Sequence, residues 1–322
     1  MNKLMTVVAA SVCAVSLSAV SAEDPQKADR VAAEAADDAE EAALFEAGFD
    51  FDFLSAYVWR NAVQTDELVM QPCVWADLTR FEPFWAGFSI WQNYGLTDRR
   101  RAIYRHGLDE TDYNVHVGAT VWSSDDADWS LDLELGHDWY TYQGVRGDLR
   151  ADYPDTREVY VKVTFANPVV DVYGQASWMY DDFGACRQAI HYELGFTREV
   201  ELCESLTLGA DWNVNFGDGR YLSFLYGGTA SGAYYHADED ETYDDYDGAS
   251  AGFGGTTLKV YLTYAVTDWL SVGATLAYTG VLSQPYRDAI VAQGADYGFG
   301  ENAGASYLRD LLWGGLSLKV SY

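Results

Sequence analysis

Short segments in which apolar and polar residues alternate recur along most of this chain, and this pattern constrains its fold more than any other feature. The clearest case is residues 312–322, where Leu316, Leu318, Val320 and Tyr322 share an apolar face and mostly small or polar residues lie between them. A period of two is that of a β-strand. The chain stops on an aromatic residue of that face, which resembles the signal that marks outer-membrane barrels for assembly. We predict that this strand closes a barrel against the first strand, with the barrel assembly machinery as a partner.

Twelve segments are predicted to be strands. Their limits are 48–60, 67–78, 83–94, 112–122, 128–142, 159–165, 170–180, 190–196, 206–216, 258–264, 270–278 and 312–322. Most are close to the roughly ten residues that a tilted transmembrane strand needs. The predicted fold is therefore all-β, an antiparallel up-and-down transmembrane barrel of about 12 strands. Residues 220–226 leave an alternative open, because they could extend the ninth strand or add a hairpin and so give fourteen strands.

Two further patterns favour a membrane barrel over a soluble β-sandwich, which also has alternating strands. The connections alternate between tight turns (79–82, 123–127, 166–168, 200–204 and 265–268) and mostly long loops, the longest being 95–111, 143–157, 217–256 and 282–309. Short turns on the periplasmic side and long loops on the outer side are the rule for outer-membrane barrels. Outward aromatic residues fall at both ends of the strands, as two girdles. The outer girdle is predicted to contain Tyr57, Trp59, Tyr94, Tyr113, Trp139, Tyr180, Phe216 and Tyr278.

The first 47 residues predict export. Residues 1–22 have the form of a secretory signal peptide, with Lys3 ahead of an apolar core and small residues before the cleavage site. Residues 23–47 are rich in Ala, Asp and Glu and are predicted to be an acidic periplasmic leader, either disordered or a short helix. The barrel then occupies residues 48–322, and we expect it in the outer membrane of a Gram-negative bacterium.

Composition excludes some classes of function. The formal net charge of −30 and the pI near 4.2 argue against nucleic acid as a partner, because phosphates need clustered Lys and Arg. The mature chain has three cysteines, Cys73, Cys186 and Cys203, whose odd number and lack of a CxxC spacing predict neither a disulfide framework nor a zinc site. No metal and no cofactor is predicted.

Side-chain parity along the strands predicts which charged residues line the interior. The inward acids are predicted to be Asp50, Asp52, Asp77, Asp112, Asp132, Glu134, Asp138, Glu158, Asp171, Asp181, Glu193 and Asp211. The inward bases are predicted to be Arg60, Lys162, Arg187, Lys259 and Lys319. If the lumen is open, this acidic surplus should concentrate cations.

Two charged outer loops are ambiguous. Arg99, Arg100, Arg101 and Arg105 could bind lipopolysaccharide phosphates, since arginine takes phosphate in a bidentate manner, or could fold inward and narrow the pore. The acidic run at residues 238–247 lacks the spacing of an EF-hand and is interpreted as a solvated loop tip that loosely gathers divalent cations.

A lipid-modifying enzyme would need a nucleophile beside a base on the lipid-facing wall. Of the five histidines, parity places only His137 on that wall within a strand, and no serine lies two residues away from it. The sequence contains no GxSxG, HExxH or Walker motif. No catalytic residue is predicted.

The stretch Tyr57-Val58-Trp59-Arg60-Asn61, followed by a strand that runs through Gln71-Pro72, resembles the opening of the TorF-type outer-membrane porin family. That family usually carries Gly where this chain has Asn61. The resemblance implies an outer-membrane pore. Together with the inward charges it predicts passive diffusion of small solutes, with a preference for cations. The alternative is a structural or adhesion barrel with a plugged lumen that acts through its outer loops.

Overall fold

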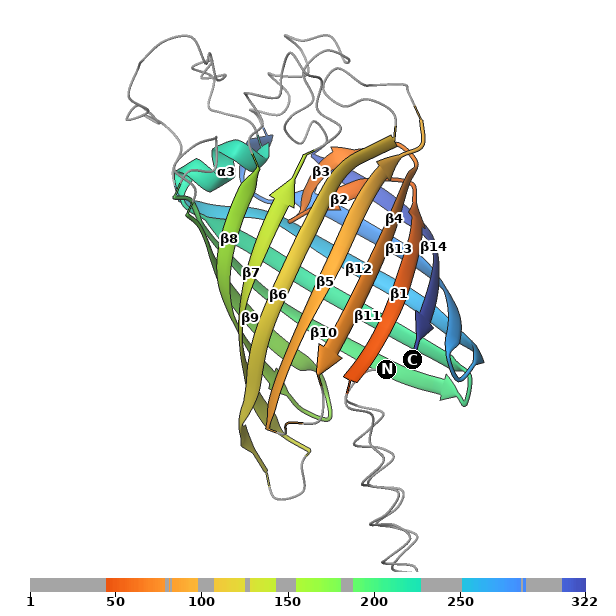
Figure 1. Cartoon of the computed structure of the whole chain (residues 1–322). Helices are drawn as coiled ribbons and strands as arrows, with labels where there is room; N and C mark the ends of the chain where they lie inside the picture. The colour runs from red at the N-terminus through yellow and green to blue at the C-terminus, as the bar shows by residue number, and fades with distance from the viewer. Residues whose placement is uncertain are drawn as a thin grey trace, which may run out of the picture.

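Twelve strands close into an antiparallel barrel in the computed structural model, which describes residues 45–78, 81, 83–97, 107–124, 128–142, 155–180, 188–226, 251–284, 286–287 and 309–322 (Figure 1). The wall strands are β1 (Phe45–Leu54), β4 (Val69–Leu78), β5 (Phe84–Gly95), β6 (Gly107–Ser123), β7 (Ser130–Thr141), β8 (Thr156–Ala166), β9 (Asp171–Met179), β10 (Ile190–Cys203), β11 (Leu206–Gly217), β12 (Gly252–Thr267), β13 (Leu270–Val281) and β14 (Asp310–Ser321). Each strand pairs with its neighbour in the chain, as predicted for an up-and-down barrel.

The last strand closes the barrel against the first. In the β1–β14 register Phe51 lies opposite Leu318 and Phe53 opposite Leu316. The backbone of Tyr322 donates to and accepts from Ala47, at N···O distances of 2.8 and 3.1 Å. The predicted closure is confirmed, and it leaves neither strand with an unpaired edge.

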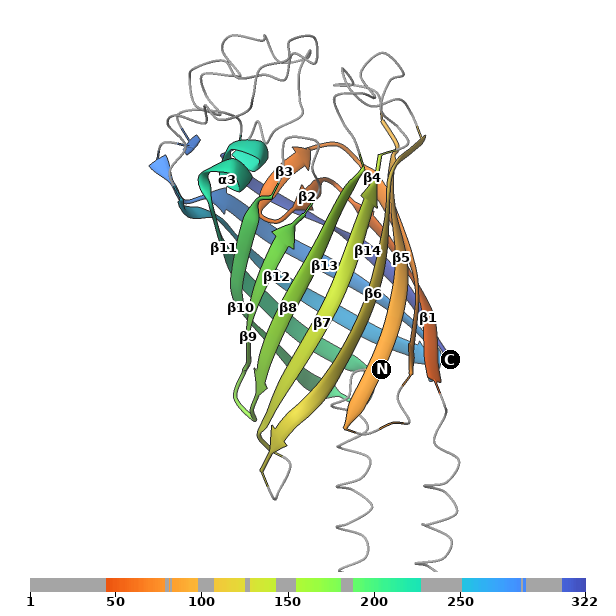
Figure 2. The same cartoon turned by 60° about the vertical axis from the view of Figure 1, so that its left-hand side comes forward.

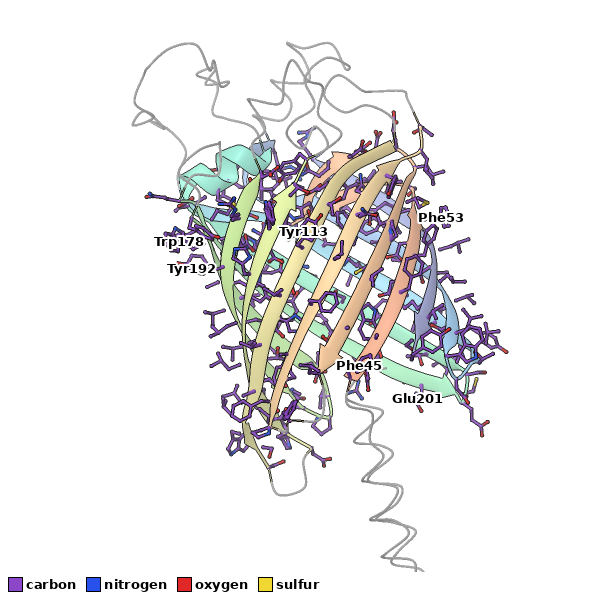
Figure 3. All side chains as sticks on the ribbon, viewed as in Figure 1. Phe45, Phe53, Tyr113, Trp178, Tyr192 and Glu201 are labelled. Atoms are coloured by element: carbon purple, nitrogen blue, oxygen red, sulfur yellow. The ribbon has the colours of Figure 1, made fainter. Side chains whose placement is uncertain are left out.

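The outer surface of the wall is apolar. Leu312, Leu316, Val115 and Leu135 are between 50% and 67% exposed, although all are large hydrophobic residues. Figure 3 shows such outward side chains around the wall, with Tyr113, Trp178 and Tyr192 towards one end of the barrel and Phe45 towards the other. A continuous exposed apolar belt fits the hydrocarbon of a bilayer and not water. Among the described residues, no helix is long and apolar enough to span a membrane.

The inner surface is shaped by aromatic rings that lie over glycines of the neighbouring strand. Five register pairs are built this way: Gly48 with Trp75, Gly118 with Trp85, Gly136 with Tyr160, Gly195 with Tyr173 and Gly209 with Tyr261. At each of these glycines a Cβ atom would collide with the ring. The glycines therefore let large rings lie flat against the wall and leave room inside the barrel.

The first predicted strand, residues 48–60, is wrong in its second half. β1 begins at Phe45 and ends at Leu54, and the chain then forms a separate hairpin of β2 (Tyr57–Trp59) and β3 (Ala62–Thr65). The turn residues Arg60 and Asn61 have φ of 48° and 65°, as a two-residue type I′ turn requires. Both parts of the segment alternate, so alternation alone could not reveal the break between them.

Residues 220–226 also differ from both predicted alternatives. They belong to a helix, α3 (Gly219–Tyr226). Asp218 caps its first turn, because its Oδ1 accepts the Tyr221 amide at 2.8 Å. Figures 1 and 2 both show α3 and the β2–β3 hairpin at one end of the barrel, which we call the hairpin end, and the C-terminus near the opposite end, the turn end.

The turn end carries tight connections. β10 joins β11 through Glu204 and Ser205, and β12 joins β13 through Asp268 and Trp269. Both were predicted as tight turns. The predicted signal peptide and residues 23–44 of the predicted leader lie outside the described residues, whereas residues 45–47 belong to β1.

Candidate functional site

The interior of the barrel is strongly acidic. Of the twelve predicted inward acids, the structure places on the inner face of the wall Asp50, Asp52, Asp77, Asp112, Asp132, Glu134, Asp138, Glu158, Asp171, Glu193 and Asp211. Asp181 lies outside the described residues. The strand registers add inward acids that were not predicted, among them Glu46, Glu110 and Glu199. These acids were not predicted because β1, β6 and β10 extend beyond their predicted limits at these positions.

Few bases face these acids. Lys162, Lys259 and Lys319 lie on the inner face, and Arg187 lies outside the described residues. Lys259 approaches Asp211, with Nζ 3.9 Å from Oδ2, and His116 Nε2 is 3.3 Å from Asp77 Oδ1. The described inner wall therefore keeps a surplus of carboxylates after these pairs are counted.

Tyrosine hydroxyls hold three of the acids in place. Tyr160 donates to Glu134 at 3.0 Å, Tyr173 donates to Glu193 at 2.8 Å, and Tyr261 donates to Glu199 at 2.9 Å. Each of these tyrosines is also one of the rings that lie over glycine. The same side chains thus set both the width and the polarity of the lumen.

Arg60 does not line the wall as predicted. It forms the tip of the β2–β3 hairpin, which turns into the lumen, and its guanidinium forms an ion pair with Glu158 on β8. It also donates to the hydroxyls of Tyr140 at 3.1 Å and Tyr221 at 3.4 Å, and it lies 4.7 Å from the centroid of the Trp59 ring. Burial alone would lower the pKa of Arg60, but the adjacent Glu158 carboxylate outweighs burial and holds the pKa well above its ordinary value.

The hairpin is fixed on other sides as well. The Tyr57 hydroxyl donates to Glu110 on β6 at 2.8 Å. The Asn61 amide donates to the Gly255 carbonyl on β12 at 3.2 Å, and the Asn215 amide on β11 donates to the Arg60 carbonyl at 2.5 Å. Strands on opposite sides of the barrel are therefore bridged, so the hairpin crosses the lumen.

Helix α3 completes this obstruction at the hairpin end. Tyr221, Leu222, Leu225 and Tyr226 are buried in one apolar cluster with Ala62 of the hairpin. The same cluster contains Met179, Ala189, Val281 and Tyr286, with Trp59 packed against it. His191 lies beside it, with its ring centroid 4.6 Å from that of Tyr221. The predicted outer-girdle residues Tyr57 and Trp59 are consequently inside the barrel, where they contact Trp91 and Tyr140.

One sequence signal could have revealed the hairpin. Asn is among the residue types that tolerate positive φ. Asn61 lies between two short alternating runs, as in a two-residue turn. The direction of the hairpin, into the lumen, has no local signal, because it depends on contacts with at least six other elements.

The remaining predictions concern the charged outer loops, the cysteines and metal ligands. The basic cluster Arg99, Arg100, Arg101 and Arg105 and the acidic run at 238–247 lie outside the described residues. Cys73 and Cys203 are unpaired, and Cys186 lies outside the described residues. Within the described part of the chain, no three Asp, Glu, His or Cys side chains are grouped as metal ligands.

His137 lies on the lipid-facing side of β7. Its Nε2 atom is 2.7 Å from the Tyr180 hydroxyl, and the two ring centroids are 5.9 Å apart. This pair sits beside Trp178, whose ring is 6.0 Å from that of Tyr180. The contacts are those of an aromatic girdle.

Neither a known family model nor a curated protein matches the chain. Among solved structures, it is similar to an outer membrane channel from Pseudomonas putida F1, with 10% identity, a TM-score of 0.47, and 87% of this chain and 96% of that one covered. The KdgM porin is 7% identical, with a TM-score of 0.40 and coverage of 86% and 99%. Outer membrane phospholipase A from Escherichia coli is 11% identical, with a TM-score of 0.43 and coverage of 85% and 92%. At these sequence identities and TM-scores, we infer nothing about function from the similarities.

Proposed function

We propose that this protein is an outer-membrane channel through which small cationic solutes diffuse passively, and that it is not an enzyme. The single observation that carries the proposal is the acidic inner wall, on which carboxylates from most of the strands face few bases. An apolar outer belt surrounds this wall. Low-dielectric walls focus the field of such charges, so cations are concentrated in the lumen and anions are repelled.

The hairpin end faces the outside of the cell in this proposal, because both tight turns described above lie at the other end. The β2–β3 hairpin and α3 then form a constriction at the outer mouth. Solutes pass beside the hairpin or pass when it moves. The likeness of residues 57–72 to TorF-type porins supports a pore as well, and those residues include this hairpin.

The reversal potential across a planar bilayer under a salt gradient tests the proposal. We expect a cation preference that falls when Asp132, Glu134 and Asp171 are replaced by Asn or Gln. Asp310→Asn is the matched control, because Asp310 is partly exposed at the hairpin end, where it pairs with Arg287. Anion preference would contradict the model and would point to the arginines at 99–105.

A plugged barrel is the second candidate, and a specific observation favours it: the hairpin crosses the lumen and is held on opposite sides. Such a barrel would act through its outer loops as a structural or adhesion protein. Liposome swelling in sugar solutions separates the two. Swelling at the rate of protein-free liposomes, together with no conductance in the bilayer, would establish the plugged barrel and refute the channel.

A further inference from the structure

The Tyr173 ring shows how this wall binds an ammonium group. One face of the ring covers Gly195, where a Cβ atom would lie 2.6 Å from the ring Cζ. The ammonium of Lys162 lies 5.0 Å from the ring centroid, and the Tyr173 hydroxyl donates to Glu193 at 2.8 Å. An alkylammonium therefore sits on an aromatic face that a carboxylate borders. This is the arrangement by which proteins recognise organic cations.

We call this arrangement, a tyrosine ring over a glycine with its hydroxyl bonded to a carboxylate, the frame. It is repeated at Tyr261 on β12. Its ring covers Gly209, and its hydroxyl donates to Glu199 at 2.9 Å. Asp211 lies on the inner face of β11, two residues from Gly209, which is the register partner of Tyr261. In the part of the chain that the structure describes, no Lys or Arg stacks on this ring, and the nearby Lys259 pairs with Asp211.

Tyr160 has the third copy of the frame, over Gly136 and bonded to Glu134, but it is buried. Tyr261 is only half-buried, so its ring is reachable from the lumen. Of the three rings, Tyr173 faces the protein's own Lys162, Tyr160 is buried, and Tyr261 is partly exposed.

We propose that Tyr261, with Glu199 and Asp211, binds alkylammonium compounds inside the lumen, as Tyr173 binds Lys162. The inference deepens the proposed channel function, because it names primary and quaternary amines as a solute class. An ammonium with an alkyl tail gains from the ring face as well as from the carboxylates, whereas K⁺ stays hydrated and gains mainly from charge.

The test is an NMR binding titration of the detergent-folded protein with n-butylammonium, with n-butanol as the neutral probe. We expect n-butylammonium to bind and n-butanol not to bind. Tyr261→Leu should weaken binding roughly ten-fold, since it removes the ring face. Tyr264→Leu is the matched control, because Tyr264 is on the same strand but faces outward, and it should leave binding unchanged. Folding of each variant is checked by its heat-modifiable shift on gels.

A second variant tests the frame itself. Lys162→Met removes the ammonium from Tyr173 and should create a second site, so that binding increases over the wild type. Adding Tyr173→Leu to that variant should remove the increase. Equal binding by wild type and Tyr261→Leu, equal binding of the neutral probe, or no gain in Lys162→Met would each overturn the inference.

Because this titration needs no open pore, its failure is distinguishable from failure of the channel. Cation-selective conductance without n-butylammonium binding refutes only the amine site. Binding without any conductance leaves the site standing and refutes the channel.

Discussion

At the scale of single residues, the most deeply buried ion pair of the described chain joins the hairpin to the wall. Arg60 and Glu158 meet in the lumen with side chains that are 10% and 0% exposed. Within the described residues, neither side chain forms a second ion pair. The pair therefore contributes strongly to docking of the hairpin tip, because separating it leaves a buried charge without compensation.

Arg60→Met or Glu158→Gln should release the hairpin tip. Removing one partner of a buried pair costs about 3–5 kcal/mol, whereas replacing both by apolar residues is close to neutral. We expect higher single-channel conductance in either single variant and near wild-type conductance in the Arg60→Met, Glu158→Met double variant. Arg157→Met is the control, because Arg157 faces outward over Trp139. Unchanged conductance in both single variants would show that the pair does not hold the constriction.

The glycines under rings give a second prediction at this scale. Gly136→Ala would place a Cβ inside the Tyr160 ring, and such overpacking costs about 1–3 kcal/mol. We expect the folded band on gels to be lost at a lower temperature than in the wild type. Gly174→Ala should not shift that temperature, because its Cβ would meet only the Glu193 carbonyl, at 3.9 Å. Equal loss in both variants would mean that strand propensity, and not the ring, decides the cost.

At the scale of elements, β14 and the β2–β3 hairpin have similar alternating patterns but different partners. β14 pairs on both edges, with β1 and β13, and so becomes wall. The hairpin pairs only with itself, and its apolar residues pack against α3 and the inner wall. Whether the apolar face of a strand contacts lipid or protein therefore depends on whether the edges of that strand pair with wall strands.

A charge on the lipid-facing side of β14 should block assembly. Leu318 is 39% exposed on the outer face, where a carboxylate in hydrocarbon costs on the order of 1–3 kcal/mol. We expect Leu318→Asp to be degraded and to give little outer-membrane protein on membrane fractionation. Ser271→Asp on β13 is the control, because it faces inward opposite Lys319 and should assemble normally. Normal yield of Leu318→Asp would contradict the assignment of this face to lipid.

At the scale of the whole molecule, the inner carboxylates lie on β1, β4 and β6 to β11, whereas the adjacent strands β12, β13 and β14 carry none on their inner faces. The tyrosine hydroxyls hold individual carboxylates in place, and the lysines on the inner wall are too few to neutralise the negative charge. The hairpin brings a cation, Arg60, into the lumen, where it pairs with Glu158.

Cation preference should therefore weaken as salt rises. The Debye length falls from about 10 Å at 0.1 M to about 3 Å at 1 M. At high salt, dissolved ions therefore screen the wall charge from a permeating ion. Reversal potentials measured at several mean salt concentrations, with a fixed concentration ratio across the bilayer, check this. Selectivity that is independent of salt would indicate a single tight cation site in place of a diffuse wall charge.

The wall of the barrel could be predicted from the local pattern of the chain. A period of two is a local property, so outward Leu318 and inward Asp132 and Glu134 could be assigned from the chain alone, and the alternation of turn and loop lengths gave the twelve-stranded order. The conformations of residues 55–65 and 219–226 could not be predicted in this way. Their patterns fit wall strands as well, and the outcome depended on contacts between distant elements, such as Arg60 with Glu158 and Asn61 with Gly255. Periodicity specifies which face of a strand is apolar, but it does not specify what that face packs against.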